Sequence, residues 1–150
     1  MNGLRIHRLR MSMLAGSLCA VATMPLPVTH AGEGEQPYTV QCKEGAASAV
    51  DCQVDKKTYI GWRTYHANCH VCHAQDAVGS TFAPSLIQRI QEISKEQYMN
   101  SVVNGYTGQI GVMPGWKDNP NVNKRFEELY IYLLARSNGA LPPGRPKRLK

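Results

Sequence analysis

The chain has 150 residues, with 17 lysines and arginines, 11 acidic residues and 43% hydrophobic residues. This composition is that of one ordinary globular domain, and it excludes collagen-like, low-complexity and strongly charged disordered chains. The sequence also lacks an internal repeat of roughly 20 to 50 residues and an unbroken apolar run of the roughly 18 residues that a membrane-spanning helix needs.

Residues 1–31 have the pattern of a secretory signal peptide. Three arginines within the first ten residues precede an apolar stretch, and Thr-His-Ala at residues 29–31 has small residues at its first and third places. This pattern predicts cleavage after Ala31 and export to the periplasm. About half of the formal net charge of +6 then belongs to the leader. A retained membrane anchor and a lipoprotein modified at Cys19 are alternatives that fit the pattern less well.

Residues 32–56 are predicted to form a short N-terminal extension that carries two cysteines. Apolar residues alternate with other residues around both Cys42 and Cys52, which predicts two short strands joined by a Gly-Ala-rich loop. In an exported chain this pair favours a disulfide, which would stabilise the fold by about 2 kcal/mol. Two free thiols in a loose arm are the alternative.

The most specific motif is the string Cys-His-Val-Cys-His at residues 69–73, which follows a helix predicted over residues 58–68. It has the C-x-x-C-H pattern of c-type haem attachment. Two thiols three residues apart on a helical turn face the same way and can add to the two vinyl groups of one porphyrin. We therefore predict one haem c, attached to Cys69 and Cys72, with His73 as an iron ligand.

Three other interpretations of this motif remain open. A thioredoxin-like redox pair would need a preceding strand in a βαβ unit, whereas the preceding residues have a helical pattern. A zinc site could combine the two cysteines with two of His66, His70 and His73, but these ligands crowd into eight residues. The third interpretation is a structural disulfide or a chance match.

The sixth ligand of the iron is predicted to come from the Gly-rich loop at residues 105–115. Outside the leader the sequence has two methionines, Met99 and Met113. Met99 falls within a predicted helix at residues 94–104 and is assigned to the core. Met113 directly precedes a proline in the loop, which can bring its thioether over the iron, and it is assigned as the distal ligand. An open position and His66 are the alternatives.

Three further segments are predicted from local signals. A short helix follows Pro84 at residues 85–93, and a Ser94…Gln97 capping box opens the helix at residues 94–104. A long C-terminal helix is predicted to begin at Asn121 or Asn123 and to end near Asn138 and Gly139. Its apolar face, at helical spacing, consists of Val122, Phe126, Leu129, Tyr130 and Leu133.

Residues 140–150 form a Pro-rich tail that carries four basic residues. Because its prolines cannot continue a regular helix, we expect the tail to be mobile. It either steers the protein to an acidic partner or membrane, or serves as a solvated end that aids solubility.

The sequence resembles the class I cytochromes c over residues 57–138. Gly61 and Tyr65 stand where that family has the small residue and the aromatic of its N-terminal helix. Tyr132-Leu133 is similar to the aromatic-Leu pair of its C-terminal helix, and Gly61 should let the two helices cross closely. The resemblance implies an all-α fold around one haem, with residues 57–139 as the cytochrome c domain.

The same resemblance assigns a role to Pro84. Residues 83–86, Ala-Pro-Ser-Leu, are similar to the family's Gly-Pro-x-Leu. The resemblance implies that the carbonyl of Pro84 accepts a hydrogen bond from Nδ1 of His73 and thereby fixes the ligand ring. Ala83 in place of glycine is a departure from the family at this turn.

Longer strings resemble a narrower group, the small periplasmic cytochromes c associated with pyrroloquinoline-quinone (PQQ) alcohol or methanol dehydrogenases. These strings occupy residues 54–63, 79–84, 119–122 and 135–141. The resemblance implies a one-electron carrier that accepts electrons from the quinoprotein dehydrogenase and passes them to a downstream cytochrome or terminal oxidase. A short segment between Gly105 and Met113 and the Cys42/Cys52 pair depart from the group.

The sequence therefore predicts an electron-transfer protein rather than an enzyme. It has no catalytic triad, phosphate-binding loop or paired carboxylates that would indicate a small-molecule substrate. Its basic residues form no stripe interleaved with aromatics, which argues against nucleic acid as a partner. A haem enzyme or gas sensor with an open or labile sixth position is the alternative, and Met113 distinguishes the two functions.

Overall fold

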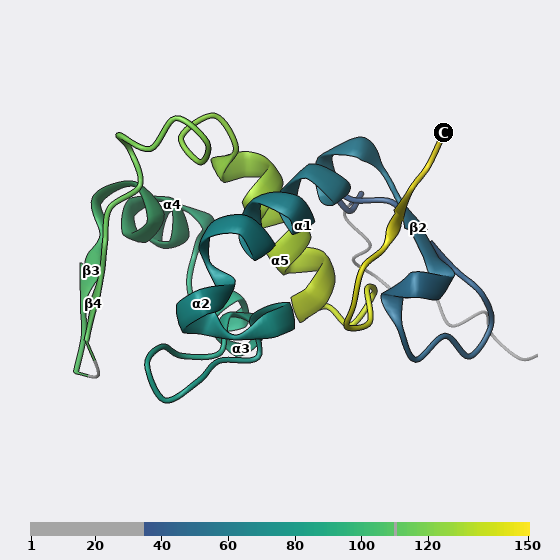
Figure 1. Ribbon diagram of the computed structural model, residues 1–150, viewed down its shortest axis with the longest axis horizontal. Helices are drawn as coiled ribbons and strands as arrows, with labels where there is room; N and C mark the ends of the chain where they lie inside the picture. The colour runs from purple at the N-terminus through teal and green to yellow at the C-terminus, as the bar shows by residue number, and fades with distance from the viewer. Residues whose placement is uncertain (1–34, 110) are drawn as a thin grey trace, which may run out of the picture. The chain divides into compact units, whose positions relative to one another are not determined.

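The computed structural model describes residues 35–109 and 111–150 (Figure 1). The predicted signal peptide and Cys19 therefore lie outside the described residues. Among the helices of the described ranges, none combines the length and the apolar character needed to cross a membrane.

Two crossing helices, α1 (Lys56–Asn68) and α5 (Phe126–Ser137), form the centre of the fold (Figure 1). At the crossing, a Cβ atom added to Gly61 would lie 2.7 Å from the Cβ of Tyr132 and would clash with the carbonyl oxygen of Glu128. Only glycine leaves room for this approach, so the close helix crossing expected at Gly61 is confirmed.

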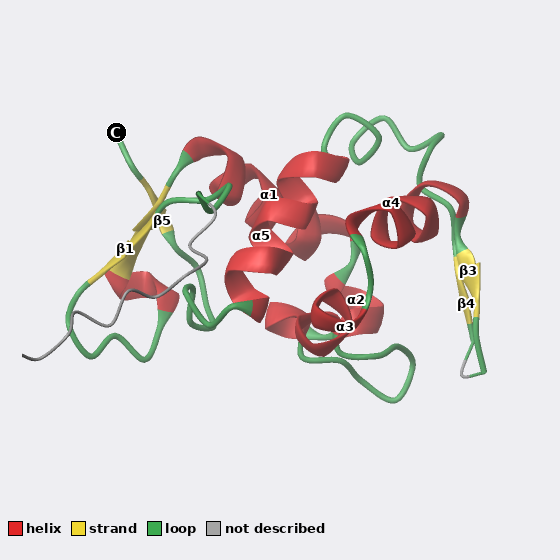
Figure 2. Ribbon diagram, turned by 180° about the vertical axis from the view of Figure 1, so that it is seen from behind, coloured by secondary structure: helices red, strands yellow, loops and turns green. Residues whose placement is uncertain are grey.

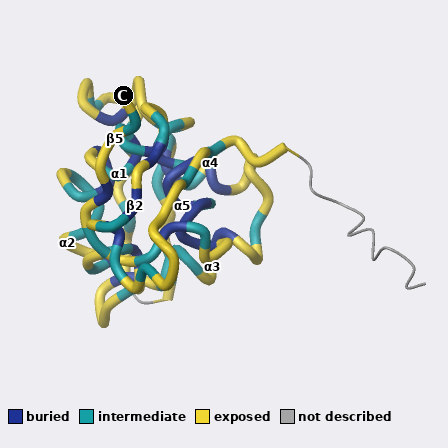
Figure 3. Tube along the Cα trace, turned by 90° about the vertical axis from the view of Figure 1, so that its right-hand side faces the viewer, coloured by how far each residue is buried: buried dark blue, intermediate teal, exposed yellow. Residues whose placement is uncertain are grey.

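The side chains around this crossing make the core. Tyr65 of α1 and Tyr132 of α5 are fully buried, and their ring centroids are 5.5 Å apart. Buried positions are concentrated along α5 (Figure 3). They are Leu129, Ile131, Tyr132, Leu133, Ala135, Arg136 and Ser137. Because α5 is covered on more than one side, the single apolar face predicted from its sequence understates its burial.

Local capping determines where the helices begin. Asp55 precedes α1, and its carboxylate accepts hydrogen bonds from the N–H groups of Lys57 (2.8 Å) and Thr58 (3.0 Å). The capping box predicted for α4 (Lys95–Asn104) is confirmed, since Ser94 and Gln97 exchange side-chain-to-backbone hydrogen bonds. These bonds satisfy N–H groups that have no partner within the helix.

Shorter elements connect the two long helices. The single-turn helix α2 (His70–His73) and the 3₁₀ turn η2 (Gln75–Ala77) follow α1 directly. Next comes α3 (Leu86–Glu92), which packs against α5, and then α4. A hairpin of two short strands, β3 (Tyr106–Thr107) and β4 (Val112–Met113), follows α4 and pairs Tyr106 with Met113. The helical fold class is thus confirmed.

The N-terminal extension forms the stapled hairpin that was expected. Strands β1 (Val40–Cys42) and β2 (Cys52–Val54) are antiparallel, are joined through the 3₁₀ turn η1 (Ala49–Asp51), and pair Cys42 directly with Cys52. A disulfide joins the two cysteines. A third strand, β5 (Lys147–Arg148), pairs in parallel with the other side of β2 (Figure 2).

Strand β5 overturns the expectation that the C-terminal tail is mobile. The N–H of Leu149 donates to the carbonyl of Val54 at 2.9 Å, and Pro146 is fully buried. The tail therefore belongs to the fold, because a buried proline and ladder hydrogen bonds to β2 hold it in place. The prolines exclude a helix, as expected, but they do not exclude an edge strand.

The predicted start of the C-terminal helix is also wrong. Helix α5 begins at Phe126, and residues 120–124 form turns instead. The side-chain oxygen of Asn119 accepts a hydrogen bond from the N–H of Asn121 at 2.9 Å. The backbone carbonyl of Asn119 accepts from the N–H groups of Val122 and Asn123. An Asn side chain that bonds to the backbone two residues on favours a turn over a helix. Val122 is nevertheless fully buried, as its apolar character predicted.

Candidate functional site

The C-x-x-C-H motif lies at the end of α1 and forms the next helical turn. The N–H of Cys69 donates to the carbonyl of Tyr65 at 2.8 Å, which completes α1. The N–H groups of Cys72 and His73 then donate back to the carbonyl of Cys69, at 3.2 and 3.1 Å. Residues three and four apart share one side of such a turn. The backbone therefore brings Cys69, Cys72 and His73 together, as the motif predicts.

Both thiols of the motif are free. Cys69 is partly buried and Cys72 is exposed. Burial, together with the smaller effect of the neighbouring Cys72, raises the pKa of the Cys69 thiol to about 12. Redox-active pairs of the thioredoxin type depend on a lowered thiol pKa, so this environment argues against that interpretation.

The ring of His73 is buried, and a hydrogen bond at Nδ1 holds it while Nε2 stays free. Its Nδ1 lies 2.9 Å from the carbonyl oxygen of Pro84, and since a carbonyl can only accept, Nδ1 carries the hydrogen. Burial lowers the pKa of His73, and the bond to Pro84 opposes this effect in part. A neutral imidazole with hydrogen on Nδ1 leaves the Nε2 lone pair for a metal. The hydrogen bond implied by resemblance is thus present.

Alanine at position 83 does not disturb this arrangement. Ala83 is buried, and its carbonyl accepts from the N–H of Ser80 at 2.9 Å. The N–H of Gly79 donates to the carbonyl of His73 at 2.9 Å, which closes the loop back onto the motif. Gly79 has φ +88°, and a Cβ atom there would lie 2.5 Å from the backbone nitrogen of Ser85. The backbone of residue 79 can approach that of Ser85 this closely because residue 79 is glycine, and no glycine is needed at position 83.

The candidate distal ligand Met113 comes from a separate part of the fold, the β3–β4 hairpin. It is partly buried and packs against the core. The hairpin base is fixed to α4, because the N–H of Trp116 donates to the carbonyl of Val102 at 2.9 Å. Gly105 has φ +85° and passes so close to Met113 that an added Cβ would lie 2.7 Å from its carbonyl oxygen. Joint ligation of one iron by Met113 and His73 stays a prediction.

The competing ligands are engaged elsewhere. The Nδ1 of His66 lies 2.9 Å from the carbonyl of Trp62, and its Nε2 lies 3.8 Å from a carboxylate oxygen of Asp76. Met99 is partly buried on α4, where it packs against the core. Among the described residues, no group of three or more His, Cys, Asp or Glu side chains converges to hold a metal ion, so the zinc site considered from the sequence is not assembled.

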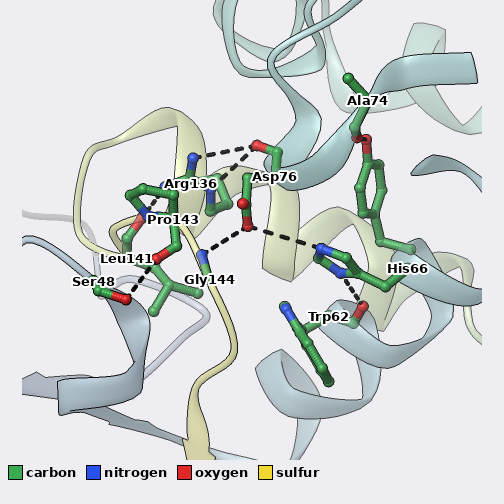
Figure 4. Close-up of polar contacts among 10 residues, drawn as sticks. Ser48, Trp62, His66, Ala74, Asp76, Arg136, Leu141, Pro143 and Gly144 are labelled. Atoms are coloured by element: carbon green, nitrogen blue, oxygen red, sulfur yellow. Dashed lines mark hydrogen bonds and ion pairs between the residues drawn. The ribbon is translucent and has the colours of Figure 1, made fainter. Parts of the chain in front are cut away.

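The donor set fits one haem of the c type. Two thiols share one helical turn, and the imidazole after them has one nitrogen fixed by Pro84 and the other available. The sequence did not indicate two residues that hold the segment after this turn, Asp76 and Arg136 (Figure 4). It indicated Tyr65 only as an aromatic of the N-terminal helix, and not as the donor to the carbonyl of Ala74. The available signal was that Arg136 directly follows the run LYIYLLA at residues 129–135, because a guanidinium that is buried beside such a run needs nearby acceptors.

Comparisons with known proteins found a matching family and two similar cytochromes. Residues 57–133 match the family described as cytochrome C oxidase, cbb3-type, subunit III. The chain is 39% identical over 115 residues to cytochrome c-553I of Paracoccus denitrificans, and the matched segment covers 74% of this chain and 51% of that protein. It is 33% identical over 100 residues to cytochrome c-555 of Methylococcus capsulatus, covering 66% of this chain and 78% of that protein.

A solved structure is also similar. The c-type cytochrome XoxG from Methylobacterium extorquens AM1 matches with a TM-score of 0.62 and 41% sequence identity. The match covers 65% of this chain and 62% of that chain. This chain thus spans about half the length of cytochrome c-553I and less than two thirds of XoxG.

Proposed function

This chain belongs to the class I c-type cytochromes, electron carriers with a covalently bound haem c, and we propose that it carries single electrons from a periplasmic PQQ-dependent alcohol or methanol dehydrogenase towards the respiratory chain. The observation that carries the proposal is the buried His73 ring, fixed at 2.9 Å from the Pro84 carbonyl directly after two free thiols.

In the proposed site, Cys69 and Cys72 hold the porphyrin through thioether bonds, and His73 and Met113 bind the iron. The bound haem supplies an iron that alternates between the ferric and ferrous states and so carries one electron at a time. Pro84 keeps the His73 ring in one orientation and increases the basicity of Nε2. Met113, the partly buried residue of the otherwise exposed strands β3 and β4, would fill the sixth position of the iron and leave no open site for small ligands. These features suit electron transfer better than chemistry on a bound substrate.

Two lines of support favour a quinoprotein as the electron donor. Four strings of this chain, at residues 54–63, 79–84, 119–122 and 135–141, resemble the cytochromes associated with PQQ dehydrogenases. The relationship to XoxG and to cytochrome c-555 agrees with that resemblance. The quinol form of PQQ holds two electrons, so a one-electron carrier must accept an electron from each dehydrogenase active site twice per turnover. The predicted signal peptide supports a periplasmic location.

The ligand assignment is tested by spectroscopy. We expect oxidised wild-type protein to show a thioether-to-iron charge-transfer band, and Met113→Ala to abolish it. The matched control is Met99→Ala, which removes the other methionine of the described residues and should keep the band. Loss of the band in Met99→Ala but not in Met113→Ala would contradict the assignment. Rapid binding of carbon monoxide to reduced wild-type protein would instead favour the haem enzyme or gas sensor.

The donor is tested by mixing the purified holoprotein with a PQQ-dependent methanol dehydrogenase and methanol. We expect the haem absorption bands to change to those of the reduced form in proportion to dehydrogenase turnover. Omission of methanol and replacement of the dehydrogenase by a nicotinamide-dependent enzyme are the controls. Reduction at the same rate in these controls would reject the proposed donor and leave the haem assignment intact.

A further inference from the structure

The segment that follows His73 adopts an unfavourable backbone. Ala74, Asp76 and Ala77 have φ values of 60°, 58° and 67°, in the left-handed region that residues with a Cβ rarely occupy. Ala74 combines this φ with ψ 171°, a combination that is almost restricted to glycine. Such a segment keeps its shape only when its surroundings hold it. The contacts that hold it are therefore part of what positions His73.

Two contacts come from the long helices. The hydroxyl of Tyr65 on α1 donates to the carbonyl of Ala74 at 2.6 Å. The guanidinium of Arg136 on α5 donates to the carbonyl of Asp76 through Nε (3.3 Å) and a terminal nitrogen (3.2 Å). Arg136 is buried, and its other terminal nitrogen donates to the carbonyl of Leu141. The same guanidinium therefore holds the segment after His73 and the chain that leaves α5 (Figure 4).

A third contact comes from the C-terminal strap, which we define as residues 141–144. The N–H of Gly144 donates to the Oδ1 of Asp76 at 2.9 Å. The same carboxylate oxygen lies 3.8 Å from the Nε2 of His66 (Figure 4). The side chain of Asp76 is only 16% exposed, so few water molecules can replace these partners. Asp76 is thus the point at which the haem-binding turn meets the C-terminal end of the chain.

The strap is itself fixed from its other side. The N–H of Ala49 donates to the carbonyl of Pro143 at 2.8 Å, and the hydroxyl of Ser48 donates to the same oxygen at 3.4 Å. Residues 48 and 49 lie in the hairpin that the disulfide closes, and the chain after Gly144 continues into β5 of the same sheet. A continuous set of contacts therefore leads from the stapled sheet through the strap to Asp76.

We infer that Asp76 is a positioning residue for His73, and that its carboxylate fixes the haem-binding turn by accepting the N–H of Gly144. The inference rests on the proposed role of His73 as an iron ligand. When the contact is lost, the segment at residues 74–77 relaxes, and the bond between Nδ1 of His73 and the Pro84 carbonyl weakens. A less basic His73 stabilises the ferric form less, so the reduction potential of the protein rises.

The decisive variant is Asp76→Gly, because glycine adopts a positive φ without strain and removes only the carboxylate. We expect the amide of Gly79, which donates to the His73 carbonyl, to exchange with solvent about tenfold faster, the factor that accompanies loss of a hydrogen bond to a charged group. We also expect a higher reduction potential and a shifted NMR signal for the His73 ring. Asp76→Asn loses the same charge but its amide oxygen can still accept from Gly144, so all three values should lie closer to those of the wild type than in Asp76→Gly.

The matched control is Asp118→Gly, which removes an exposed aspartate and should leave the exchange rate and the potential unchanged. If Asp76→Gly has the amide exchange rate and the reduction potential of the wild type, position 76 requires only its backbone conformation, and the inference is overturned. Equal effects of Asp76→Asn and Asp76→Gly would do the same. If Asp76→Gly does not take up haem, the wild-type holoprotein decides, because rapid exchange of the Gly144 amide refutes the contact. None of these measurements involves a dehydrogenase, so they are independent of the proposed donor.

Discussion

The Gly61 crossing gives a prediction whose size follows from the structure. In Gly61→Ala the new Cβ would lie 2.7 Å from the Cβ of Tyr132, whereas carbon atoms normally approach no closer than about 3.5–4.0 Å. Helices α1 and α5 must therefore separate by about 1 Å at the place where Tyr65 and Tyr132 are fully buried. The clashing carbonyl of Glu128 belongs to the backbone and cannot move by changing its rotamer.

Two opposing terms determine the stability of this variant. Overpacking costs about 1–3 kcal/mol, and the rigid contact places Gly61→Ala at the upper end of that range. Alanine regains about 1 kcal/mol of helix propensity relative to glycine. We therefore expect the free energy of unfolding to fall by about 2 kcal/mol.

Urea unfolding of the holoprotein, followed by far-UV circular dichroism, measures this difference. The matched control is Ala67→Gly at an exposed position of the same helix, which reports helix propensity alone and should lose about 1 kcal/mol. If Gly61→Ala is as stable as the wild type, or more stable by the propensity term, the close crossing does not exist and the packing argument fails.

Two further predictions concern the N-terminal part of the described chain. Partial burial raises the pKa of Asp55, but hydrogen bonds from Thr39, Thr58 and Lys57 outweigh this effect and lower the pKa below its usual value of 3.8. Its stabilising contribution is therefore complete above that value and is lost as the pH falls through the lowered folded-state pKa. Asp55→Asn should lose less unfolding free energy than the wild type between about pH 5 and pH 2, and an equal loss in both would contradict this. Replacing Cys42 and Cys52 by alanine should lower the free energy of unfolding by about 2 kcal/mol and leave the haem spectrum unchanged; an unchanged urea midpoint would show that the disulfide does not stabilise the fold.

Local signals in the sequence were sufficient for several elements. The helix before the motif, the capping box of α4 and the stapled hairpin depend on residues that are close in the chain, so their patterns predict them correctly. The start of α5 was predicted wrongly because the asparagines that can cap a helix can equally form a turn. Asn119 forms that turn, and the helix begins later, at Phe126.

Contacts between distant parts of the chain could not be predicted in this way. Strand β5 forms because β2 offers it an open edge, and nothing within the tail itself indicates that edge. The role of Asp76 likewise depends on Arg136 and Gly144, which approach it only in the folded chain. The motif predicts the side chains that would contact the haem, but the residues that hold the motif in place required the structure.

The register of the N-terminal hairpin has a consequence for the maturation of the haem site. The four cysteines of the described residues can form three different sets of two disulfides in an oxidising compartment. Cys42 and Cys52 are separated by ten positions and lie opposite each other in β1 and β2, so the chain segment between them closes a short local loop. Their pairing removes the two thiols that could compete for Cys69 and Cys72. With Cys42 and Cys52 bridged, the thiols of Cys69 and Cys72 would stay available for the porphyrin.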